Sequence, residues 1–271
     1  MDPRKEKYRK IFKGVQDEMS LLLLKETKKL EPLDVSIKAS SSRASAINKL
    51  RIDMCEPLQL QQHKKKLLCV ELAGSRSGRE IIEALIAEES NNQSRLLFVE
   101  FGSFMGASSK RWSQVVDHID VITVDPWIDD LSEYLSEIRV CPIRNSMVKG
   151  FSHDEYSQMI EDLKAMGIFY YVKTLLNDYK NILPIRGRSP YLLFQLHLRG
   201  IYPDIIYYDA NKSGVDLRIA LELFPFSILC GDDFMWKDEN GQIPLQAALE
   251  EIQQIYGGKV DFLGQSWILR R

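Results

Sequence analysis

The stretch LLFVEFGSFMGASSK, residues 96–110, contains the pattern that decides the fold. It opens with an apolar run that predicts a buried strand, and a loop with Gly102 and Gly106 follows at once. Glycine lets the backbone turn sharply and approach a ligand closely. Ser108 and Ser109 then stand where a helix would begin, with free backbone N–H groups pointing at whatever the loop binds.

The spacing of the two glycines, Gly-x-x-x-Gly, matches neither the dinucleotide-binding fingerprint nor the phosphate loop that ends in Lys-Ser/Thr. By itself the loop therefore fits a plain strand-to-helix turn as well as a ligand-binding turn. Ligands of parallel sheets bind beyond the carboxyl ends of the strands, so the other strand ends are informative.

The chain around this stretch alternates short apolar runs with amphipathic segments. Strands are expected at 96–101, 121–124, 182–185, 204–208, 227–230, 260–263 and 267–269. Helices are expected at 109–116, 154–166, 191–198, 215–224 and 245–256. This alternation predicts an α/β fold: a mostly parallel sheet of seven strands with helices on both faces.

The N-terminal third has a different sequence pattern, without the alternation of strands and helices. Residues 4–30 place apolar side chains at three- and four-residue steps and predict an amphipathic helix, and 78–89 predict another. The small polar stretch 36–46 between them is expected to be a loop or linker. We therefore divide the chain into an N-terminal helical region, 1–92, and the alternating region, 93–271. The N-terminal helices are candidates for a cap over the site and for contacts in a homo-oligomer.

The composition is that of an ordinary globular protein, with 271 residues, 45% apolar and 27% charged. Lys and Arg number 36 against 38 Asp and Glu, which argues against nucleic acid or a membrane surface as the partner. The four cysteines are scattered and indicate neither a disulfide framework nor a zinc site. Because no apolar run is long enough for a signal peptide or a spanning helix, we expect a cytoplasmic protein.

Asp125 ends the second expected strand, about 20 residues beyond the glycine loop. A carboxylate at this point accepts hydrogen bonds from ribose hydroxyls in nucleoside-binding α/β folds. Pro126 and Trp127 follow it and offer a flat wall to an adenine ring. The alternative is an Asp that caps the strand beside a core tryptophan.

Two further strand ends carry acids, Asp209 on one and the pair Asp232 and Asp233 on the other. Neighbouring strands lie about 5 Å apart, so these carboxylates can converge. Like charges repel unless a cation or a proton relieves them, and Mg²⁺ favours oxygen ligands of this kind. The alternative is that the acids cap loops and helix N-termini without a metal.

Four strings, VEFGSFMGASS, TVDPW, PDIIYYDANKSGVDL and SILCGDDFMW, together resemble class I S-adenosylmethionine-dependent methyltransferases over roughly residues 93–271. Within that class the chain is similar to the group of sugar and natural-product O-methyltransferases and cephalosporin-hydroxylase-like proteins. The resemblance implies a Rossmann-like sheet whose last strand, 266–271, lies antiparallel at the end of the sheet. Four motifs in the right order are more specific than any one of them.

The resemblance also implies roles for matching positions. The implied cofactor-binding residues are Glu100, Gly102, Ser103, Gly106, Ser108, Ser109, Asp125, Trp127, Arg188, Ser189 and Asp209. Among them Asp125 would bind the cofactor ribose, and Arg188 and Ser189 would contact the adenine. Asp209, Asp232 and Asp233 resemble the divalent-cation ligands of the metal-dependent sugar methyltransferases, and are counted as catalytic for that reason.

One position departs from the family pattern. The family often has a His or an Asp two or three residues beyond the Asp of strand four, where this chain has Asn211 and Lys212. Asn cannot take a proton, and Lys does so only when burial or positive neighbours lower its pKa. We therefore keep Lys212 as a catalytic candidate and expect Mg²⁺ to activate the hydroxyl that is methylated.

The expected function is methyl transfer from S-adenosylmethionine to a hydroxyl of a small molecule or sugar, assisted by Mg²⁺. Two alternatives stay open. The departure at Asn211 favours a non-catalytic methyltransferase-like module that binds the cofactor or a partner protein. The acidic strand ends also fit a metal-dependent, hydroxylase-like enzyme on the same fold.

Overall fold

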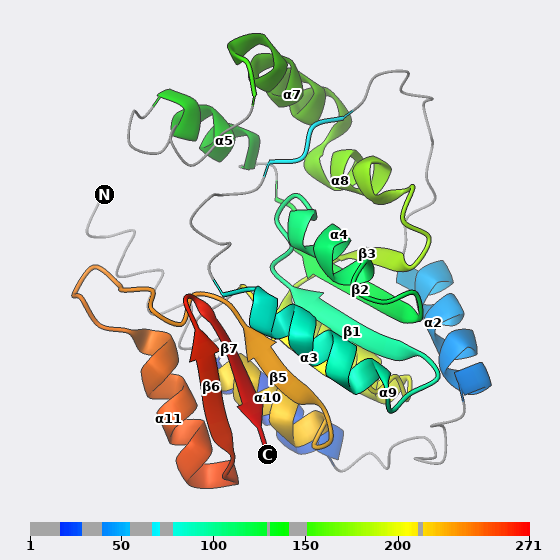
Figure 1. Cartoon of the computed structure of the whole chain (residues 1–271), viewed down its shortest axis with the longest axis vertical. Coiled ribbons are helices and arrows are strands. Elements are labelled where there is room, and N and C mark those ends of the chain that lie inside the picture. The colour runs from blue at the N-terminus through cyan, green and yellow to red at the C-terminus, as the bar shows by residue number, and fades with distance from the viewer. Residues whose placement is uncertain are drawn as a thin grey trace.

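The computed structural model describes residues 17–28, 40–54, 67–70, 78–128, 131–140, 151–210 and 214–271. These residues form one seven-stranded sheet with helices on both faces (Figure 1). The strands are β1 (Leu96–Phe101), β2 (Ile119–Asp125), β3 (Ile182–Arg186), β4 (Ile205–Tyr208), β5 (Ile228–Gly231), β6 (Lys259–Leu263) and β7 (Ser266–Arg270). All seven expected strands are present.

The strand order is β3-β2-β1-β4-β5-β7-β6. The first five strands pair in parallel, and β7 runs antiparallel to both β5 and β6. The prediction of an α/β, Rossmann-like, mostly parallel sheet is therefore confirmed. The last strand is antiparallel as expected, but it lies between β5 and β6 and not at the end of the sheet. The reason is burial, because the apolar strand β7 is buried whereas the more polar β6 suits an exposed edge.

Helices cover both faces of the sheet. They are α2 (Ser40–Met54), α3 (Glu80–Ser90), α4 (Ala107–Ser113), α5 (Leu131–Val140), α7 (His153–Met166), α8 (Ile168–Leu176), α9 (Ser189–Leu198), α10 (Gly214–Leu223) and α11 (Pro244–Tyr256), and residues 17–28 are also helical. Side chains of α2, α9, α10 and α11 form one apolar cluster with the sheet, and those of α3, α4, α7 and α8 form the other. In the described residues, no helix has the length and apolarity needed to cross a membrane.

Strand β1 lies between β2 and β4 in the sheet, and all six of its residues are buried. Because successive side chains of a strand point to opposite faces, Leu97, Val99 and Phe101 join the first cluster, whereas Leu96 and Phe98 join the second. The side chains of Glu100 and Phe101 therefore point to opposite faces of the sheet.

The N-terminal region differs in part from expectation. The loop expected over 36–46 is wrong where the structure describes it, because α2 begins at Ser40. Serine and alanine do not forbid a helix, and Ile47 and Leu50 stabilise this one by packing in the first cluster. The helix expected over 4–30 is present at residues 17–28, and the rest of that range lies outside the described residues. The division into 1–92 and 93–271 stays a prediction.

Candidate functional site

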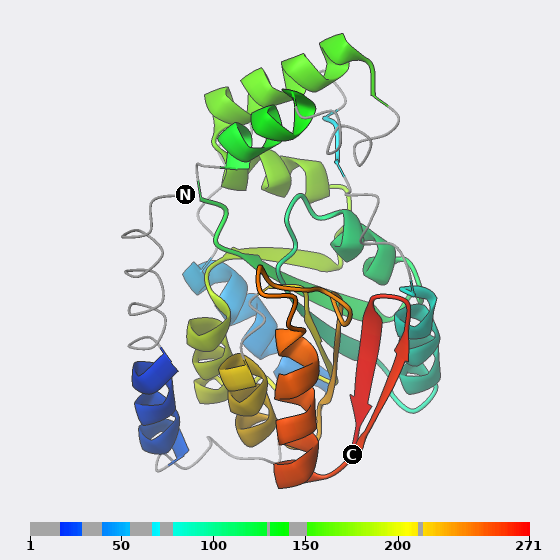
Figure 2. The same ribbon diagram turned by 90° about the vertical axis from the view of Figure 1, so that its left-hand side faces the viewer.

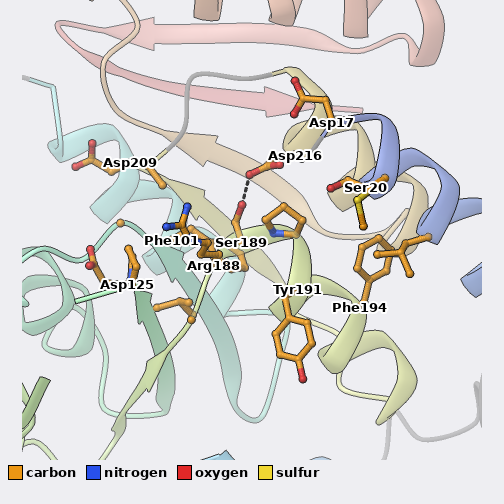
Figure 3. Close-up of a pocket in the computed structure, with 18 of the residues that line it drawn as sticks. Asp17, Ser20, Phe101, Asp125, Arg188, Ser189, Tyr191, Phe194, Asp209 and Asp216 are labelled. Carbon is orange, nitrogen blue, oxygen red and sulfur yellow. Dashed lines mark hydrogen bonds between the residues drawn. The ribbon is translucent and has the colours of Figure 1, made fainter. Parts of the chain in front are cut away.

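A cavity of about 610 Å³ lies beyond the carboxyl ends of the central strands (Figure 3). This volume falls within the range of roughly 300–1,000 Å³ that is usual for small-molecule sites. Five of the predicted cofactor residues line it: Gly102, Asp125, Arg188, Ser189 and Asp209. They follow β1, β2, β3 and β4, so the structure brings four separate strand ends together around one space.

Gly102 lines this cavity, and no residue with a side chain fits its place. Its φ is +90°, and an added Cβ would lie 2.1 Å from the backbone oxygen of Asp209. Its N–H donates to the carbonyl of Val124 at 2.8 Å. Gly106 begins α4 with φ +79° and packs against Leu176. The glycine loop therefore packs closely against the backbone at the ends of β2 and β4.

Asp125 holds this loop and also faces the cavity. Its two carboxylate oxygens accept from the backbone N–H groups of Phe104, at 3.0 Å, and Trp127, at 2.9 Å. Burial raises the pKa of Asp125 to about 6, although these two hydrogen bonds act to lower it. The residue therefore combines the strand-capping role, which the sequence left open, with a place in the cavity wall.

Trp127 does not line the cavity, contrary to the expectation of an adenine wall. Its side chain is 1% exposed, and its ring centroid lies 5.3 Å from that of Phe169 in the second apolar cluster. Its ring Nε1 donates to the carbonyl of Phe104 at 2.6 Å. The core alternative is the one observed, and Pro126 alone reaches the cavity.

Glu100 does not line the cavity either, because strand alternation turns it away from Phe101. Its buried carboxylate accepts from the hydroxyls of Ser109 and Thr123 and from Nε1 of Trp112. These bonds fasten β1 to β2 and α4. The other predicted cofactor-binding residues of the loop do not line the cavity either: Ser103, Gly106 and Ser108.

The carboxylates that follow β4 and β5 converge as expected, but they converge on an arginine. Arg79 precedes α3; its Nη2 donates to Asp209 at 3.3 Å and its Nε to Asp232 at 3.1 Å. The side chains of Arg79, Asp232 and Asp209 are 3%, 0% and 20% exposed. Burial alone would lower the pKa of Arg79, but nearby Tyr207 and the two acids raise it overall. Burial raises the pKa of Asp232, and Arg79 opposes that shift.

The structure does not support the expectation that Asp209, Asp232 and Asp233 hold Mg²⁺. The described residues contain no group of three or more His, Cys, Asp or Glu side chains that could hold a metal ion. Any cation relieves the repulsion between neighbouring carboxylates, and here a guanidinium already lies against two of them. Asn211 and the base candidate Lys212 lie outside the described residues.

The sequence analysis did not name Arg79 as a site residue, although two features pointed to it. Arg79 follows Gly78, whose φ is +92°, and a Cβ at Gly78 would lie 1.5 Å from the backbone oxygen of Leu263. Only a glycine lets the chain pass so close to the turn between β6 and β7. The pair of acids without a counter-charge also indicated that a cation had to come from elsewhere.

Two further parts of the cavity wall include residues that the sequence did not predict, namely Asp216 and the residues of segment 17–28. Ser189 at the start of α9 donates from its hydroxyl to Asp216 of α10, and both line the cavity. On another side, Asp17, Met19, Ser20 and Leu23 of the helical segment 17–28 line it. This segment runs beside α9 and α10 (blue in Figure 2). It places an N-terminal helix on the wall of the cavity.

Comparison with known proteins found no matching family model and no matching curated protein. Solved structures do match. A proposed caffeoyl-CoA O-methyltransferase from Staphylococcus aureus is 13% identical, with a TM-score of 0.42 over 92% of this chain and 100% of that chain. An SAH-bound methyltransferase from Podospora anserina is 12% identical, with a TM-score of 0.40 over 93% and 95% of the two chains. A proposed O-methyltransferase from Klebsiella pneumoniae is 13% identical, with a TM-score of 0.39 over 89% and 91%.

At 12–13% identity and with TM-scores of 0.39–0.42, these likenesses do not tell what the chain does. What the chain binds and does has to be argued from the cavity itself.

Proposed function

We propose that this chain is an S-adenosylmethionine-dependent O-methyltransferase that acts on a hydroxyl group of a small molecule. The observation that carries the proposal is the cavity that Gly102, Asp125, Ser189 and Asp209 line from four strand ends. Carboxylates at two of those ends, a glycine loop at a third and a helix start at the fourth suit a nucleoside with an amino-acid tail.

The residues present fit this cofactor. Asp125 reaches the cavity from the end of β2, where it would accept hydrogen bonds from the ribose hydroxyls. Pro126, Pro190 and Tyr191 supply flat apolar surfaces on which an adenine would pack. Because Gly102 has no side chain, the methionyl part of the cofactor could pass close to the backbone at this point.

When bound, S-adenosylmethionine supplies a methyl group on a positively charged sulfur. The part of this chain is to bind and align the acceptor, since positioning accounts for much of the rate in such a transfer. Asp209, which Arg79 holds by one oxygen, faces the cavity and is the candidate acceptor of a hydrogen bond from the substrate hydroxyl. The apolar side chains of Met19, Leu23 and Phe194 would exclude water from this space.

The apolar wall also favours one class of acceptor. Met19, Leu23 and Phe194 offer carbon surface and no hydrogen-bond partner from their side chains. A hydroxyl carried on an apolar or aromatic body matches this wall better than a free sugar, whose hydroxyls would lose their hydration there.

Calorimetry with S-adenosylmethionine and its demethylated product S-adenosylhomocysteine tests the cofactor. We expect binding by the wild-type chain, and roughly tenfold weaker binding by Asp125→Asn, since one charged hydrogen-bond acceptor is lost. Asp120→Asn is the matched control, because Asp120 lies on the same strand β2 but pairs with Arg95 away from the cavity. Absence of binding by the wild type at millimolar cofactor would refute the proposal.

A second candidate is a binding module without turnover. Its supporting observation is that Arg79 already engages Asp209 and Asp232, while no histidine lines the cavity among the described residues. Binding of the cofactor with no transfer to any of a panel of phenols and alcohols, followed by mass spectrometry, would favour this second function.

A further inference from the structure

The guanidinium of Arg79 contacts two carboxylates and an aromatic ring. Two of its nitrogens donate to carboxylates at the ends of β4 and β5, and its Cζ lies 5.8 Å from the ring centroid of Trp112. A guanidinium over an indole face gains a cation–π interaction as well as two ion pairs. Gly78 beside it is packed against the backbone of Leu263, so the segment that carries Arg79 is fixed too.

We propose that Arg79 is a built-in cation that takes the place of a divalent metal ion between Asp209 and Asp232. The chain accordingly binds no divalent cation at this edge of the sheet, and Arg79 acts as a positioning residue for Asp209. This holds whether or not the chain transfers a methyl group.

The state of Asp232 is the first argument. Its Oδ2 accepts from Arg79, and its Oδ1 accepts from the hydroxyl of Ser266 at 3.3 Å. The residue is 1% exposed, so any metal ion would have to displace both a buried guanidinium and a hydroxyl. Displacing Arg79 would leave its positive charge buried without a carboxylate, which is strongly unfavourable.

The state of Asp209 is the second argument. Its side chain is 20% exposed and faces the cavity, whereas its Oδ2 accepts from Arg79. The arginine thus fixes the direction of a carboxylate that would otherwise be repelled by Asp232 across the two strands.

The position of the arginine is the third argument. Bonds from one planar guanidinium to carboxylates on two neighbouring strands need the fork of an Arg, which a Lys does not reproduce. Arginine stays charged at any pH at which the protein is folded. A change in pH therefore cannot neutralise Arg79 and free the two carboxylates for a metal ion.

Manganese binding tests the proposal, with Mn²⁺ measured by electron paramagnetic resonance and by the shift in melting temperature. We expect no Mn²⁺ bound by the wild type up to about millimolar concentrations, a range in which weak protein sites still bind divalent ions. Arg79→Met keeps the length of the side chain and removes its charge. We expect it to gain Mn²⁺ binding, at least roughly tenfold tighter than any seen in the wild type.

Three variants serve as controls. Arg95→Met removes an arginine from an exposed ion pair with Asp120 and should gain no Mn²⁺ binding. Arg79→Met combined with Asp232→Asn should lose whatever Arg79→Met gains. Arg79→Lys keeps the charge and should remain without Mn²⁺.

Two results would overturn the proposal. One is Mn²⁺ binding by the wild type that Asp232→Asn abolishes, and it can be observed even if Arg79→Met fails to fold. The other is a folded Arg79→Met that binds no more Mn²⁺ than the wild type. Neither result depends on cofactor binding, so the outcome is separate from that of the calorimetry with S-adenosylmethionine.

Discussion

Gly102 is the residue of the cavity wall at which backbone geometry most tightly limits substitution. With φ at +90° and Asp209 oxygen 2.1 Å from the place of a Cβ, Gly102→Ala forces the loop or β4 to move. We expect a loss of about 2–4 kcal/mol in the free energy of unfolding, measured with urea. Gly187 also lines the cavity but has open space around it, so Gly187→Ala should stay within about 0.5 kcal/mol. Equal losses in the two variants would contradict this reading of the loop.

Asp125 gives the fold a pH dependence of unusual sign. Burial raises its pKa to about 6 from an ordinary 3.8, so the folded chain holds the proton more tightly than the unfolded chain does. The free energy of unfolding should therefore rise by up to about 3 kcal/mol from this residue as the pH falls from about 7 to 4. Asp125→Asn should lack that rise. Wild-type and Asp125→Asn stabilities that run parallel over this pH range would show that the carboxyl is not protonated in the folded state.

Helix 17–28 is an element that depends on few buried side chains. Leu24 is 6% exposed and belongs to the first apolar cluster, whereas Leu22 is 61% exposed on the same helix. Leu24→Ala should cost about 2–3 kcal/mol of docking free energy, and Leu22→Ala less than about 0.5 kcal/mol. Hydrogen exchange checks this, because faster exchange should be confined to this helix and spare β1. Faster exchange for Leu22→Ala alone would mean that the helix turns its other face inward.

The elements also differ in how well a sequence predicts them. Strands β1 to β5 and β7 are largely buried and mostly apolar, and short apolar runs of this kind are predictable. The exposed edge strand β6 was predictable from the shorter run 260–263. The sequence predicts a loop over residues 40–46, because serines and alanines carry no apolar period of their own. Only the packing of Ile47 in the first apolar cluster makes that segment part of a helix. Neither helix α5 nor helix α8 was predicted.

For the whole molecule, the limit of sequence reasoning is long-range pairing. The sequence placed acids at the ends of β2, β4 and β5, because a strand end can be read locally. Arg79 lies 130 residues from Asp209 and 153 from Asp232, and no local pattern joins them. Trp127 and Glu100 show the same limit, because which side of a strand end faces the cavity depends on the layers packed around it.

The proposed cofactor should therefore bind this chain without help from a metal ion. A ligand that binds only the folded state at a hundred times its Kd adds about 2.7 kcal/mol to the free energy of unfolding. For a domain of this size that corresponds to a rise of roughly 5 °C in Tm. We expect S-adenosylhomocysteine to produce this rise equally in buffer with EDTA and in buffer with Mg²⁺, because Arg79 already neutralises the acids beside the cavity. A rise that vanishes in EDTA would mean that a metal ion takes part in binding, and that the Arg79 ion pairs open when the ligand arrives.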